Sequence, residues 1–156
     1  MKQIEDKIIE NEEGIFNQSI RYKTLVQFNG QAVEPKDYFP VWVNNLADDV
    51  SLEGSLLNGF VEGKEDVRSI VFCIRKIYER QEFTFAGFYN DNIFLESYTG
   101  WFHGVSVGCL VMVAPNAEGK AQHLAVSYRP VNALQLLSRL VAEQLAGTSA
   151  GNHFPI

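Results

Sequence analysis

The side chains that could carry out acid–base or nucleophilic chemistry are few and scattered in this 156-residue chain. Its three histidines are His103, His123 and His153, and none forms an i, i+4 pair or lies at metal-ligand spacing from a cysteine. The sequence has no Gly-Xaa-Ser-Xaa-Gly elbow, no Ser-His-Asp constellation and no dinucleotide-binding glycine fingerprint. These patterns predict no metal and no cofactor, and they leave open whether the protein is an enzyme.

Two further segments carry charges at close spacing. Asp48 and Asp49 are adjacent acids at an expected corner between a helix and a strand, where such side chains usually accept backbone N–H bonds of the turn. A structural role is therefore favoured over catalysis. Residues 63–65 (GKE) do not form a phosphate-binding loop, because the other glycines and the Ser or Thr after Lys64 are missing.

Composition excludes several classes of partner. The chain is 46% hydrophobic and 21% charged, which is typical of a globular domain. Its net charge of −6 argues against a nucleic-acid partner, since nucleic-acid binders carry a basic face. No window approaches the length of apolar sequence that spans a membrane.

Residues 1–13 lack the basic start and apolar core of a signal peptide. Cys73 and Cys109 both lie in apolar runs, which favours buried free thiols in a reducing compartment. We therefore expect a cytoplasmic protein.

Hydrophobic periodicity predicts an α+β protein with one domain over residues 1–156 and a core at about 18–146. Helical spacing favours helices at 18–28, 36–47, 64–80 and 130–146, although 18–28 alternates well enough to be a strand instead. Between the last two helices the period changes to two, which predicts strands at 83–89, 93–99, 102–114 and 120–128. The tail to Ile156 is expected to be disordered or bound to a partner.

Two stretches of the chain resemble a known family. Residues 46–54 (LADDVSLEG), followed by 63–68 (GKEDVR), resemble the entry segment of the fold shared by nuclear transport factor 2, ketosteroid isomerase and the SnoaL-like polyketide cyclases. Residues 118–120 (EGK), followed by 128–130 (YRP) and an amphipathic helix, are similar to a subgroup of SnoaL-like proteins. The resemblance implies a cone-shaped, curved antiparallel sheet wrapped around N-terminal helices, with an extra C-terminal helix and an enclosed pocket.

The positions that would carry ketosteroid-isomerase chemistry hold other residue types. The general base of that enzyme corresponds here to Gly54, which cannot take up a proton. The Asp of its oxyanion hole corresponds to Ser106 or Val111, depending on the alignment. Its tyrosine donor corresponds to Tyr22, across a gap. That chemistry is therefore not expected.

Strand alternation and the resemblance together predict which residues face the pocket. If Ser106 points inward, so do Phe102, Gly104, Gly108, Leu110 and Met112. The pocket-facing aromatics of the family correspond to Ile70 on the long helix and Tyr128 on the last strand. The expected ligand-binding residues are Tyr22, Ile70, Ile74, Ser106, Leu110, Leu124 and Tyr128. A filled core without a usable cavity is the alternative.

The same alternation assigns an apolar outer face to the sheet. The residues expected there are Glu96, Tyr98, His103, Val105, Val107, Cys109, Val111, Val113 and His123. Such a face favours a homodimer packed sheet to sheet over an exposed His–Glu acid–base pair.

Three functions remain open. The first is a homodimer that binds a small, largely apolar molecule. The second is an isomerase, cyclase or dehydratase that uses Tyr22, Tyr128 and an unassigned acid. The third is a purely protein-binding role. A carboxylate inside the cavity would favour the enzyme.

Overall fold

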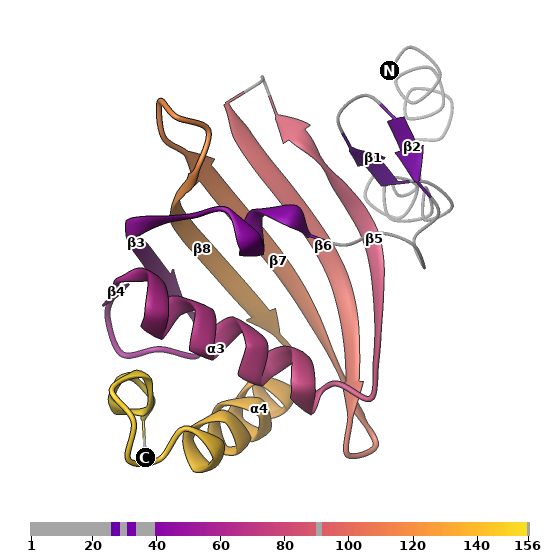
Figure 1. The fold of residues 1–156 in the computed structure, drawn as a ribbon. Helices are drawn as coiled ribbons and strands as arrows, with labels where there is room; N and C mark the ends of the chain where they lie inside the picture. Colours follow the sequence, from indigo (N-terminus) through magenta and orange to yellow (C-terminus); the bar gives the residue numbers. More distant parts are fainter. Residues whose placement is uncertain (1–25, 29–30, 34–39, 90–91, 156) are drawn as a thin grey trace.

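A curved six-stranded sheet is the largest element of the fold (Figure 1). The computed structural model describes residues 26–28, 31–33, 40–89 and 92–155. The strands are β3 (Leu46–Gly54), β4 (Val61–Glu62), β5 (Arg80–Tyr89), β6 (Ile93–Phe102), β7 (Val105–Pro115) and β8 (Ala121–Arg129). They lie in the order β4-β3-β8-β7-β6-β5, and every neighbouring pair is antiparallel except β3 and β8, which are parallel. The predicted α+β class is confirmed.

Two long helices pack against this sheet. α3 (Lys64–Ile77) crosses one face, called the inner face below, and α4 (Val131–Gln144) lies at one end of the sheet (Figure 1). α3 buries one apolar face, which includes Val67, Ile70 and Ile74. It has acidic residues in its first turn and basic residues in its last, as the helix dipole favours. Both helices confirm their predictions. No helix in the described part of the chain is both long and apolar enough to cross a membrane.

The helix predicted at 36–47 is wrong over the residues that the structure describes. Only the short 3-10 helix η2 (Val41–Asn44) forms, and β3 begins at Leu46. The helical spacing of Trp42, Val43 and Leu46 was misleading, because these residues belong to η2 and to the start of β3 rather than to one helix.

Both ends of the described chain also differ from expectation. Of the helix predicted at 18–28, the structure describes only Val26–Phe28, which is strand β1 and pairs with β2 (Gln31–Val33). The remainder lies outside the described residues. The C-terminal tail forms the 3-10 helix η3 (Ala150–His153), and Phe154 is buried in the core, so the expected disorder is wrong there.

The predicted face of β7 is reversed, as is the side predicted for Glu96 and Tyr98 on β6, whereas Phe102 is buried as predicted. His103 and Gly104 form a two-residue hairpin turn in which both have positive φ, so Phe102 pairs directly with Val105. Directly paired residues share a face, whereas continuous alternation through the turn would separate them. Six of the residues expected outside on these strands are therefore buried on the inner face, and Val105 is half-buried there; the six are Glu96, Tyr98, Val107, Cys109, Val111 and Val113. The exception is His103, which lies in the turn itself.

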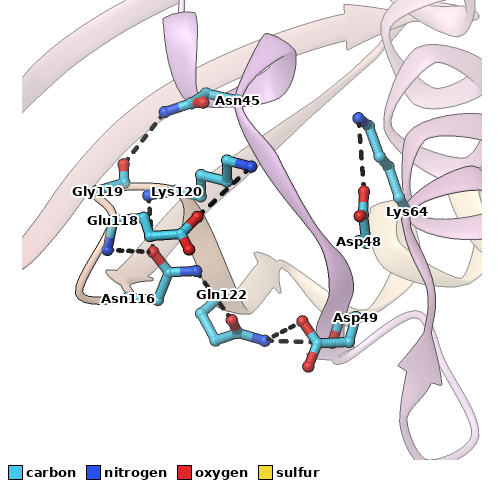
Figure 2. A network of polar contacts seen from close by, with 9 residues as sticks. All are labelled: Asn45, Asp48, Asp49, Lys64, Asn116, Glu118, Gly119, Lys120 and Gln122. Carbon is cyan, nitrogen blue, oxygen red and sulfur yellow. Dashed lines mark hydrogen bonds and ion pairs between the residues drawn. The ribbon is translucent and has the colours of Figure 1, made fainter.

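A polar network connects β3 to the hairpin between β7 and β8 (Figure 2). The Asn116 carboxamide accepts from the backbone N–H groups of Glu118 and Lys120, at 2.9 and 3.0 Å. Gln122 donates to the backbone carbonyl and the carboxylate of Asp49, and the exposed Asp48 carboxylate lies 4.0 Å from the Lys64 ammonium. Both aspartates thus take part in surface contacts, mainly with side chains rather than with backbone N–H groups.

The C-terminal end of α3 is fixed by a close approach to β6. The ring of Tyr78 lies so near Gly100 that a Cβ at residue 100 would be 2.6 Å from its Cε1 atom. The Tyr78 hydroxyl also lies 3.0 Å from the Tyr98 hydroxyl, within hydrogen-bonding distance. Only glycine at residue 100 leaves room for this contact.

We expect Gly100→Ala to lower the free energy of unfolding by about 1–3 kcal/mol, because the new methyl group overpacks a buried ring. Gly108→Ala is the matched control. Its Cβ would meet only the flexible end of Arg129, at 3.0 Å, and should have a smaller effect. Urea unfolding measures both, and equal losses would contradict the assignment.

Candidate functional site

Two small cavities lie between α3 and the inner face, with Tyr128 on the wall of both. The larger of the two has a volume of about 50 Å³ and is lined by residues that include Trp42, Ile74, Glu96, Tyr98, Val126 and Tyr128. The other has about 30 Å³, and its wall includes Leu52, Gly54, Ile70, Ile74, Val126 and Tyr128. Because the walls share residues of α3 and β8, we treat the two as one candidate site.

Neutral hydrogen-bond donors surround Tyr98 on the inner face. Its hydroxyl lies 3.0 Å from that of Tyr78, and the side chains of Tyr128 and Cys109 lie near enough to influence its pKa. Burial raises the pKa of each of the three tyrosines well above its ordinary value, and it raises the pKa of Cys109 to about 12. At neutral pH these groups are therefore protonated. They can donate hydrogen bonds, but Cys109 is not a thiolate nucleophile.

Two more polar groups lie on the wall of the larger cavity. Glu96 is 1% exposed, and its carboxylate is on the same strand face as Tyr98. Trp42 is half-buried, and its Nε1 atom is buried without a hydrogen-bond partner in the part of the chain that the structure describes. A buried indole N–H without an acceptor is uncommon in folded proteins, so it marks a position where an additional acceptor would be stabilising.

The structure places some of the predicted site residues together and separates others. Tyr128 and Ile74 line both cavities, and Ile70 lines the smaller one. Leu124 is buried on the inner face but lines neither of these cavities. Ser106 and Leu110 are exposed on the opposite face, because the hairpin turn reverses the alternation on which they depended. Tyr22 lies outside the described residues.

Sequence reasoning missed Trp42, Glu96 and Tyr98. Trp42 falls within the helix predicted at 36–47, and the other two were assigned to the outer face. A signal for the strand residues was present in the sequence. A two-residue turn at 103–104 gives the register in which Tyr98 pairs with Cys109 and Glu96 with Val111. Since Val111 in turn pairs with Val126, this register places all of them on the face of Tyr128.

The raised pKa values predict that the free energy of unfolding falls at alkaline pH. The unfolded chain releases the protons of Tyr98, Tyr128 and Cys109 near their ordinary pKa values, whereas the folded chain retains them. Stability is therefore complete below about pH 8 and should fall steadily above about pH 9. Thermal unfolding across this range measures the slope, and Tyr98→Phe should reduce it. A stability that does not change up to about pH 11 would contradict the burial of these groups.

Comparisons with known proteins identify the fold. No family model and no curated protein matches the chain. An uncharacterised protein with a cystatin-like fold from Silicibacter pomeroyi DSS-3 is similar in structure, with a TM-score of 0.63 and 12% identity over 69% of this chain and 75% of that one. A steroid delta-isomerase from Pseudomonas aeruginosa has a TM-score of 0.62 and 15% identity over 67% of this chain and 77% of that one.

A de novo designed protein with a curved β-sheet also matches, with a TM-score of 0.52 and 20% identity over 90% of this chain and 98% of that one. At these identities the likeness concerns the fold alone. The resemblance found in the sequence is confirmed at that level, because the chain has the curved-sheet α+β fold of the nuclear transport factor 2-like and cystatin-like structures.

Proposed function

We propose that this protein binds a small, largely apolar molecule that carries a hydrogen-bond-accepting oxygen, in the interior beside Tyr128. The observation that carries the proposal is that Trp42, whose buried N–H has no partner among the described residues, lines a cavity whose wall also includes Tyr98 and Tyr128. The remaining wall is mostly apolar, with Ile74 and Val126 among its residues. Small-molecule sites combine such a wall with a few polar groups that orient the ligand.

The cavities are too small to hold a ligand unless they enlarge. Volumes of about 50 and 30 Å³ are far below the roughly 300–1,000 Å³ of typical small-molecule sites. One wall must therefore move outward when a ligand binds. The 3-10 helix η2 is the element best suited to this, since it has only four residues and no side-chain cap, and it carries Trp42.

Tyr128→Phe tests the role of the phenol in binding. It removes one hydroxyl at nearly constant volume and should weaken a ligand that bonds to this hydroxyl by about 1–3 kcal/mol. Tyr89→Phe is the matched control, because Tyr89 is 63% exposed and lines neither cavity. Mass spectrometry of molecules released from the natively purified variants measures occupancy. Equal occupancy in both variants would contradict the assignment.

A second candidate function is acid–base catalysis, and Glu96 favours it. A carboxylate on an apolar cavity wall can take up a proton from a bound substrate, while neutral phenols such as Tyr98 and Tyr128 donate to the oxygen that becomes negative. This chemistry suits an isomerase, cyclase or dehydratase. The similarity in fold to a steroid delta-isomerase agrees with it but identifies no substrate.

Proton exchange distinguishes catalysis from binding alone. If Glu96 is a base, the protein should speed deuterium uptake from D₂O next to the carbonyl of a small ketone, and Glu96→Gln should lower that rate at least about 100-fold. Glu82→Gln is the matched control, because the Glu82 carboxylate is exposed beside Arg80, and it should leave the exchange rate unchanged. Exchange that is absent in the wild-type protein, or equal in both variants, would favour the binding function.

We propose that the protein is a homodimer formed through the outer face of the sheet, the face opposite α3, in the cytoplasm. Phe85 and Leu110 are 45% and 44% exposed there, and strand pairing aligns both with Ser97. These two residues replace Tyr98 and Val107 in the interface predicted from the sequence, because the latter are buried inside. A stable interface would bury at least about 1,000 Å². A monomeric mass in solution at micromolar concentration would contradict this assembly.

A further inference from the structure

A serine, a histidine and a glutamate form a hydrogen-bonded chain on the outer face of the sheet. The hydroxyl of Ser51 lies 2.6 Å from Nδ1 of His123, and Nε2 of the same ring lies 3.1 Å from the Glu53 carboxylate. Ser51 and Glu53 are on β3, and His123 is directly paired with Ser51 on the parallel strand β8. The intervening Leu52 and the adjacent Leu124 are buried, so these three side chains point away from the cavity.

The two contacts indicate which nitrogen of the His123 ring carries the hydrogen. A carboxylate can only accept a hydrogen bond, so Nε2 of His123 bears the hydrogen and donates it to Glu53. In the neutral imidazole Nδ1 then carries no hydrogen and accepts the bond from the Ser51 hydroxyl. This is the arrangement that activates a serine, with a base on the hydroxyl and a carboxylate behind the base. The ring nitrogens are used in the opposite order from the serine-protease triad.

The surroundings favour a particular class of substrate. Phe60 is 58% exposed, and its ring centroid lies 6.2 Å from that of His123, which offers an apolar surface beside the base. Glu62 pairs with Ser51 across β4, so a second carboxylate lies on the same face. Negative charge therefore repels anionic substrates. Neither Phe60 nor Glu62 offers a donor to a developing oxyanion, so the substrate needs a good leaving group.

We propose that Ser51, His123 and Glu53 form a second site, in which Ser51 accepts an acyl group from uncharged, activated aryl esters. The Ser51 oxygen bonds to the acyl carbon while its proton passes to Nδ1 of His123. The bond between the acyl carbon and the aryl oxygen then breaks, and the departing phenolate takes that proton from the ring. The products are O-acyl-serine and a phenol. Glu53 stabilises the imidazolium formed between the two steps.

The test uses the full chain and 4-nitrophenyl acetate, an uncharged activated ester. Intact mass spectrometry should show the addition of one acetyl group, and peptide fragmentation should place it on Ser51. His123→Gln keeps a polar side chain but removes the base, and it should lower the rate of acetylation at Ser51 at least about 100-fold. Ser51→Ala should abolish the adduct.

Ser127→Ala is the matched control, because Ser127 is an exposed serine on the same face of β8 and should not affect the rate. If His123→Gln fails to fold by circular dichroism, Glu53→Gln decides, with an expected decrease of at least about tenfold. The proposal is overturned if the folded wild-type protein gives no adduct at Ser51. It is also overturned if the adduct forms at an unchanged rate in the folded His123 or Glu53 variant.

Discussion

The contact between the Tyr78 ring and Gly100 is the constraint on which the interior depends. It joins the end of α3 to the C-terminal part of β6 at a separation that leaves no space for a side chain on residue 100. With α3 held there, Ile70 and Ile74 join a buried core cluster that includes residues of β3, β6, β7 and β8. The same contact brings the Tyr78 hydroxyl to within 3.0 Å of the Tyr98 hydroxyl. The packing of Tyr78 against Gly100 therefore positions both α3 and a polar group next to Tyr98.

The polar groups of the interior follow from this closure. A buried hydroxyl without a partner costs free energy, and the hydroxyls of Tyr78 and Tyr98 reduce that cost by lying within hydrogen-bonding distance of each other. Because burial keeps them protonated, they form a neutral, donor-rich region beside the carboxylate of Glu96. Trp42 differs, since its N–H has no acceptor among the described residues. Within the described part of the chain, a hydrogen-bond acceptor is therefore missing beside η2, and a ligand that supplied one to Trp42 would stabilise the interior there.

Much of the fold could be predicted from the sequence because its signals are local. Helical spacing identified α3 and α4, and alternation identified β5 to β8. The candidate site could be predicted only in part, because it depends on which face each strand presents. Apolar spacing across η2 and the start of β3 imitated a helix, and the turn at His103 and Gly104 reversed the face predicted for β7. Tyr128 was placed correctly inside, whereas Glu96 and Tyr98 were assigned to the wrong side.

The two faces of the sheet thus offer different chemistry. The inner face holds neutral donors and one carboxylate in a closed, apolar space, and the outer face holds a hydrogen-bonded Ser51–His123–Glu53 chain in contact with solvent. Ser51 and Glu53 form no recognisable sequence motif with a histidine. Their partner His123 lies 72 residues after Ser51 and 70 residues after Glu53, on another strand. Parallel pairing of β3 with β8, which alternation does not reveal, brings them together.

The most direct measurement of the central claim is a high-resolution crystal structure of protein purified without denaturation. The account predicts density larger than a water molecule beside Tyr128, with an acceptor atom within hydrogen-bonding distance of Trp42 Nε1. An interior filled by the protein's own side chains, with Trp42 Nε1 bonded to a protein acceptor, would contradict it.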